Sequence, residues 1–114
     1  METTTEARLR IYLGEDKRLG DAPLYRAIVR KAHELGMAGL TLMRGTHGFG
    51  HSTRMHTVDV LFSEDLPVII EVIDLPEKVQ ALSKVLETVR GVGLMTLDSV
   101  AVIRRPPPSR NDGP

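Results

Sequence analysis

The chain has 114 residues, with 15 lysines and arginines against 15 aspartates and glutamates, and it has no cysteine. This length allows one domain, because two independent hydrophobic cores would not fit into it. The balanced charge argues against a general nucleic-acid surface, since such a surface needs a positive field to neutralise phosphates. The lack of cysteine excludes disulfides, thiol catalysis and cysteine-ligated metals, so any metal would need histidine or carboxylate ligands.

The two ends of the sequence are predicted to lie outside the folded domain. Residues 1–14 lack the basic start and long apolar run of a secretory signal, and no apolar stretch approaches the roughly 18 residues that span a bilayer. These features predict a cytoplasmic protein.

We expect disorder over 1–6 and over the proline-rich tail 106–114, where successive prolines remove backbone donors. The folded domain is therefore expected to span 7–105.

Hydrophobic periodicity predicts three elements in the first part of the chain. Apolar and polar residues alternate over about 7–14, as in a half-buried strand. Pro23 marks the start of a helix, whose apolar positions recur at spacings of three and four until Gly36 supplies a stop. The chain is strand-like again over 38–43.

The second part of the chain repeats this pattern after a glycine-rich segment. Residues 57–62 alternate, and residues 67–73 are apolar on both faces. Either these form one long strand with a break at 63–66, or they form a hairpin of two strands. A second helix opens at 75–77, and a last strand covers about 94–104.

This order of elements predicts an α+β fold, the ferredoxin-like βαββαβ sandwich, with two helices on one face of an antiparallel sheet. Two helices can cover only that face. The strand over 67–73 is nevertheless apolar on both sides. An apolar face of this kind is usually covered by a partner. We therefore expect the second face to be buried in a homo-oligomer rather than exposed on a small monomer.

Glu71 is unusual because it interrupts this apolar strand. A buried carboxylate is costly unless it is paired. Two interpretations stay open: an ion pair with Arg8, Arg10 or Arg44, or a contact with a ligand.

A glycine-rich loop follows the second predicted strand. Its glycines leave backbone N–H groups unshielded, and basic side chains lie beside them, which suits a phosphate. A flexible loop whose glycines only form turns is the alternative. The glycines are Gly45, Gly48 and Gly50, and the basic or protonatable residues are Arg44, His47, His51 and Arg54.

Three histidines in this region allow a second hypothesis. His47, His51 and His56 could bind a divalent metal, because neutral imidazole is a common ligand. No nearby carboxylate is fixed by the spacing, so solvated or phosphate-facing histidines are the competing interpretation. Nucleophilic catalysis is not indicated, since the sequence has neither cysteine nor a Gly-x-Ser-x-Gly elbow.

Several segments resemble the PII signal-transduction superfamily, namely Gly39-Leu40-Thr41, Gly48-Phe49-Gly50 and Leu66-Pro67-Val68-Ile69-Ile70-Glu71-Val72. Further segments, at 9–12, 23–25, 44–45 and 63–67, are similar to its short PII-like branch. The likeness covers about 7–105. It implies a trimer of ferredoxin-like subunits with an adenine nucleotide in the clefts between neighbours. It also implies a loop, here 45–56, that reports the ligand state to a partner.

The resemblance also implies which residues contact the ligand. Thr41 would lie near the adenine, Gly50 near the phosphates, and Gly91 and Gly93 in a second phosphate-contacting turn. Arg104, with Arg105, matches the cationic end of the last strand. Together with the loop residues above, the expected nucleotide set is Thr41, Arg44, Gly45, Gly48, Gly50, Gly91, Gly93, Arg104 and Arg105, and the expected partner-facing set is His47, Phe49, His51 and Arg54.

The sequence departs from the PII pattern in ways that affect this expectation. His51-Ser52 replaces an Arg-Gln pair, and the turn 93–96 lacks the usual lysine, so AMP and ADP are as plausible as ATP. The chain is thus expected to be a non-catalytic, nucleotide-sensing regulator that needs no metal and binds no nucleic acid, with weak nucleotide hydrolysis left open. The alternatives are a divalent-metal-binding protein, similar to the divalent-cation tolerance proteins of the same trimeric fold, and an accessory subunit of a membrane ion channel. Some PII-like proteins are associated with fluoride-channel-type membrane proteins.

Overall fold

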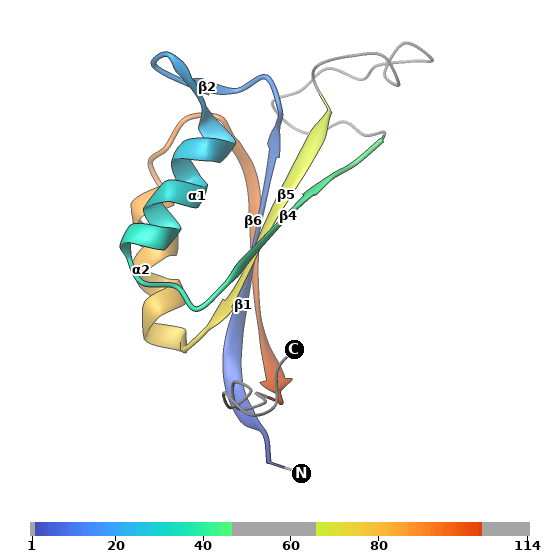
Figure 1. Cartoon of the computed structure of the whole chain (residues 1–114), viewed down its shortest axis with the longest axis vertical. Helices are drawn as coiled ribbons and strands as arrows, with labels where there is room; N and C mark the ends of the chain where they lie inside the picture. Colours follow the sequence, from blue (N-terminus) through green and yellow to red (C-terminus); the bar gives the residue numbers. More distant parts are fainter. Residues whose placement is uncertain (1, 47–65, 104–114) are drawn as a thin grey trace, which may run out of the picture.

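The computed structural model of the protein describes residues 2–46 and 66–103. Within these ranges the elements are β1 (Thr4–Gly14), β2 (Arg18–Leu19), β3 (Ala22–Pro23), α1 (Leu24–Glu34), β4 (Leu40–Arg44), β5 (Pro67–Asp74), α2 (Pro76–Leu86) and β6 (Val92–Val102). Four strands form an antiparallel sheet in the order β4-β5-β1-β6, and β2 and β3 form a small hairpin. Both helices lie against the same face of the sheet (Figure 1). The predicted ferredoxin-like α+β fold is confirmed.

The first strand begins earlier than predicted. β1 begins at Thr4, so the expectation of disorder over the whole of 1–6 is wrong for 4–6. The reason is strand pairing, because these residues lie opposite Val102, Ala101 and Val100 at the end of β6. The predicted alternation over 57–62, residues 63–65 of the expected break and the tail 106–114 lie outside the described residues.

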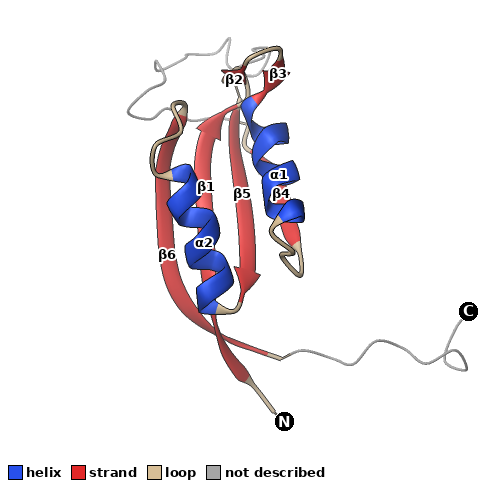
Figure 2. Cartoon of the chain, turned by 90° about the vertical axis from the view of Figure 1, so that its left-hand side faces the viewer, coloured by secondary structure: helices blue, strands red, loops and turns tan. Residues whose placement is uncertain are grey.

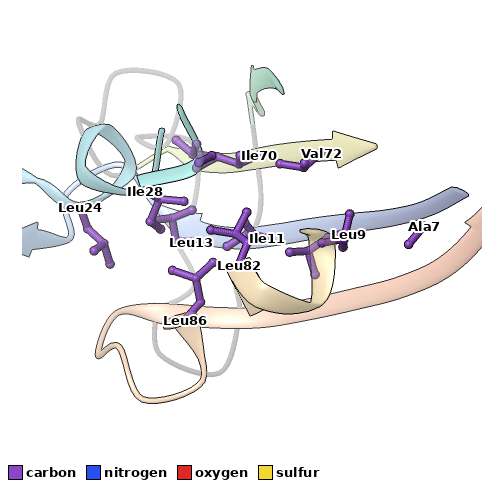
Figure 3. Close-up of a cluster of buried hydrophobic side chains, with 13 residues drawn as sticks. Ala7, Leu9, Ile11, Leu13, Leu24, Ile28, Ile70, Val72, Leu82 and Leu86 are labelled. Carbon is purple, nitrogen blue, oxygen red and sulfur yellow. The ribbon is translucent and has the colours of Figure 1, made fainter. Parts of the chain in front are cut away.

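The core lies between the sheet and the two helices (Figures 2 and 3). Alternate residues of β1 and β5 point toward the helices, as the two-residue repeat of a strand requires. The helices contribute residues spaced three and four apart, as predicted. The buried apolar residues are Ala7, Leu9, Ile11, Leu13, Leu24, Ile28, Ala32, Val68, Ile70, Val72, Val79, Leu82 and Leu86.

The opposite face of the sheet, which we call the open face, carries no helix in the described part of the chain (Figure 1). Directly paired residues of neighbouring strands share a face. One row across the open face is therefore polar and consists of Thr41, Glu71, Arg10 and Thr96. A second row is mainly apolar and consists of Met43, Ile69, Tyr12 and Leu94.

Two ion pairs cross the open face. Arg10 Nε donates to Glu71 Oε2 at 2.7 Å. Arg8 donates to both carboxylate oxygens of Asp98, with distances of 3.0 Å from Nε to Oδ1 and 2.5 Å from Nη2 to Oδ2. The first pair shows that the ion-pair interpretation of Glu71 is correct and that Arg10 is its partner.

Truncation of the core side of α2 should destabilise the fold. Leu82 is fully buried, so Leu82→Ala is expected to lower the free energy of unfolding by about 2–5 kcal/mol. Val85 of the same helix is 41% exposed, and Val85→Ala should cost less than about 1 kcal/mol. Urea denaturation of both variants at one protein concentration measures the difference. Equal losses would contradict the assigned orientation of α2.

The Arg8–Asp98 pair predicts a loss of stability in acid. The side-chain hydrogen bond from Arg8 holds the pKa of Asp98 below its ordinary value. The ionised carboxylate therefore stabilises the fold above the ordinary aspartate pKa of about 3.9, and this contribution is lost as the pH falls through the lowered folded-state pKa.

Asp98→Asn should accordingly be less stable than the wild type at about pH 6, and this difference should shrink as the pH falls toward about 2, when both are unfolded with urea. Asp21→Asn, which changes an exposed aspartate in the turn between β2 and β3, is the control and should not show this pH dependence. A stability gap for Asp98→Asn that stays constant with pH would refute the prediction.

Candidate ligand site at the edge of the sheet

A pocket of about 260 Å³ lies at the β4 edge of the open face. The run 38–41, which leads from the end of α1 into β4, forms one wall, and Glu71 and Ile73 of β5 form another. Val102 at the end of β6 completes the lining. The lining residues are Ala38, Gly39, Leu40, Thr41, Glu71, Ile73 and Val102.

Thr41 and Glu71 supply the polar groups of this pocket. They lie directly opposite each other in the β4–β5 pairing, so both side chains belong to the open face. Glu71 is 20% exposed in spite of its ion pair with Arg10. A hydroxyl and a carboxylate between apolar walls suit a planar base or a sugar hydroxyl that donates hydrogen bonds. The carboxylate makes the same pocket unfavourable for a phosphate.

Arg44 lies on the other side of the sheet. Residues three apart in a strand point to opposite faces, and the Arg44 side chain is held there by two groups. Its guanidinium forms an ion pair with Glu15 at 2.8 Å, and it lies 5.8 Å from the centre of the Tyr25 ring. The structure therefore does not bring Arg44 to the pocket of Thr41.

The backbone N–H of Gly45 is already used. It donates to the carbonyl oxygen of Pro67 at 2.7 Å. A Cβ atom at this position would lie 2.7 Å from Pro67 Cγ, so the close approach of the two strands explains the glycine. This N–H is not a spare donor for a phosphate.

The predicted turn at Gly91 and Gly93 lies at the opposite edge of the sheet. Val92 is joined to Arg44 by one row of paired residues that runs through Leu13 and Val68. The two edge strands are therefore three steps apart, or about 14 Å at the usual strand spacing of about 4.8 Å. Gly91 has φ +101°, a conformation that favours glycine, so the turn itself accounts for that residue.

The remaining predicted residues lie outside the part of the chain that the structure describes. These are Gly48, Gly50, Arg104 and Arg105 of the nucleotide set, His47, Phe49, His51 and Arg54 of the partner set, and His56 of the metal alternative. Within 2–46 and 66–103, no group of three histidines or acidic residues could hold a metal ion. Neither of the two described helices, α1 and α2, is long and apolar enough to cross a membrane.

Sequence reasoning did not identify Ile73 and Val102 as pocket residues, nor Asp74 behind the pocket wall. Ile73 and Val102 are ordinary strand residues whose proximity depends on the twist of the sheet, so no local pattern marks them. Asp74 had a local signal, because an acidic residue stands at the end of an apolar strand just before the predicted helix start. Its role becomes visible only when Ala38 is placed beside it.

Comparison with solved structures identifies the fold as that of the PII-like proteins. CPII from Thiomonas intermedia K12, bound to ADP, AMP and acetate, aligns with a TM-score of 0.68 at 16% identity over 91% of this chain and 94% of CPII. CPII bound to ADP and bicarbonate gives 0.68 at 16% identity over 90% and 93%. A protein of Thermus thermophilus described as PII-like gives 0.65 at 18% identity over 90% and 94%.

Sequence comparison identifies the family. The model of DUF190, described as Uncharacterized ACR, COG1993, matches residues 6–102. The UPF0166 protein of Aquifex aeolicus is 36% identical over 107 residues, which cover 90% of this chain and 98% of that protein. The UPF0166 protein of Methanocaldococcus jannaschii is 29% identical over 97 residues, which cover 84% and 90%. The chain therefore belongs to the DUF190 family, and it has the PII-like fold that the resemblance implied.

Proposed function

We propose that the protein is a cytoplasmic, non-catalytic PII-like regulator that binds an adenine nucleotide between neighbouring copies of the chain. The family match and the PII-like fold support a regulatory role. CPII, which shares the fold, is bound to ADP and AMP in solved structures. In this proposal the segment 45–56 passes the ligand state to a partner protein.

The arrangement of the two edges of the sheet carries the proposal. The pocket with Thr41 lies at the β4 edge, while the glycine turn at 91–93 lies at the β6 edge, with β5 and β1 between them. Val102 at the end of β6 reaches the pocket, but the turn 91–93 lies at the opposite end of that strand. We therefore place a ligand that uses both the pocket and a glycine turn between two chains, with the β4 edge of one beside the β6 edge of the next.

The polarity of the pocket favours one orientation of the nucleotide. Glu71 accepts hydrogen bonds and repels negative charge, so the adenine or ribose end belongs at Thr41 and Glu71. The phosphates then point away from this pocket. In this proposal the phosphates contact the cationic residues Arg104 and Arg105, which follow β6 in the sequence.

The open face supports assembly of several copies. Met43 is 39% exposed and Leu94 is 57% exposed, and both lie in the mainly apolar row of that face. Burial of these side chains against another copy would remove apolar area from water. We propose a trimer, since three copies can place each β4 edge beside a β6 edge in a closed ring.

Binding and assembly can be tested with the same sample. Isothermal titration with AMP, ADP and ATP should give saturable heat with at least one of them, at one nucleotide per chain. Sedimentation should give three times the 12.6 kDa mass of one chain. Absence of heat with all three at millimolar concentration would remove the nucleotide proposal, and a stable single-chain mass would remove the inter-chain site.

The pocket threonine should contribute directly to nucleotide affinity. Thr41→Val keeps the shape of the side chain and removes its hydroxyl, so we expect the dissociation constant to rise about threefold to tenfold, the value of one hydrogen bond. Thr5→Val is the matched control, because Thr5 is exposed on β1 and does not line the pocket. Equal affinities of Thr41→Val and wild type would show that the base does not bind at this pocket.

A further inference from the structure

The pocket wall formed by residues 38–41 is attached to the start of α2 by the carboxylate of Asp74. The backbone N–H of Ala38, the first residue of the wall, donates to Asp74 Oδ2 at 2.8 Å. The other oxygen, Oδ1, accepts the backbone N–H of Leu75 at 2.8 Å. Leu75 directly precedes α2, so Asp74 joins this wall to the N-terminal end of α2.

Asp74 is buried beside the pocket without lining it. Its residue is 5% exposed, and it faces the helices, whereas Glu71 and Ile73 of the same strand face the pocket. Buried carboxylates are tolerated when hydrogen bonds satisfy them, and a bond to an ionised acceptor is stronger than a neutral one. The contact with Ala38 is therefore a strong and sheltered restraint on the wall.

Two further contacts fix the same segment. Lys78 of α2 donates from Nζ to the carbonyl oxygen of Gly36 at 3.0 Å, just before the wall begins. At its other end the wall enters the sheet, where Leu40 and Thr41 pair with Val72 and Glu71. The run 38–41 is thus restrained before, at and after its first residue.

We propose that Asp74, supported by Lys78, is a positioning residue that holds the wall 38–41 in its ligand-binding conformation. This inference rests on the proposed nucleotide site. A wall that is fixed before binding loses less conformational freedom when the ligand arrives, which strengthens binding. Asp74 acts through Ala38 and the residues that follow it, and it does not touch the nucleotide.

The first experiment compares two variants that each remove one negative charge near the start of α2. Asp74→Asn keeps the shape of the side chain but replaces one accepting oxygen with an NH₂ group, which cannot accept a backbone N–H. We expect the dissociation constant for ADP, measured by calorimetry, to rise on the order of tenfold. Glu77→Gln, an exposed position in the first turn of α2, should leave it within about twofold.

The second experiment measures the wall directly. Amide hydrogen exchange without nucleotide should be faster at 38–41 in Asp74→Asn than in the wild type, while the central part of β5, 68–72, stays protected. If Asp74→Asn does not fold, Lys78→Met replaces it, since this variant loses only the exposed contact with Gly36. It should also speed exchange at 38–41 and weaken ADP binding, with a smaller change.

Two results would overturn the inference. One is an unchanged ADP affinity in a folded Asp74→Asn, or in Lys78→Met where that variant is used. The other is equal weakening in Asp74→Asn and Glu77→Gln, since the loss would then come from charge rather than from the contact. If the wild type binds AMP or ATP but not ADP, the same comparison is made with that nucleotide. If it binds none of the three, the proposed function fails separately. The exchange rates at 38–41 then decide whether Asp74 holds the wall, and unchanged rates reject it.

Discussion

Two helices on one side of a four-stranded sheet are the constraint on which the remaining structure depends. Their packing gives the chain a core on one face and leaves the other face to carry a paired polar row and a mainly apolar row. An ion pair at a half-exposed site adds little stability by itself. The Arg10–Glu71 pair has a second effect, because it fixes an accepting carboxylate at the edge of a pocket. The open face is therefore where the proposed function places the ligand and the partner copies.

The strand order places Arg44 and the glycine turn at 91–93 on opposite edge strands of the sheet. Arg44 and Val92 belong to one row of paired residues, yet they lie at opposite edges of the sheet. Within one chain, β5 and β1 lie between Arg44 and the glycine turn at 91–93. In the proposed assembly the β4 edge of one copy lies beside the β6 edge of the next, which brings these two segments together. The proposed site is thus a consequence of antiparallel topology rather than of any one motif.

Most of the fold could be predicted from hydrophobic periodicity, because a strand and a helix repeat at different intervals and the core residues here keep those intervals. Leu9, Ile11 and Leu13 in β1 and Val79, Leu82 and Leu86 in α2 are examples. The site was predicted less completely. Thr41 lines the pocket, but Ile73 and Val102 meet there through sheet pairing and twist, and the sequence also offered three arginine partners for Glu71. Long-range contacts of this kind depend on register, which local patterns do not determine.

The contacts of Arg44 and Gly45 bear on how the proposed nucleotide site would recognise phosphates. Arg44 is paired with Glu15 on the face opposite the Thr41 pocket, and the N–H of Gly45 is bound to Pro67, so neither group is placed to contact a ligand in that pocket. The pocket itself contains a carboxylate, which attracts donors and repels phosphate. In the proposed function, recognition at the β4 edge therefore depends on the base and the sugar. In the same proposal, groups from elsewhere in the chain or from a neighbouring copy distinguish AMP, ADP and ATP by their phosphates.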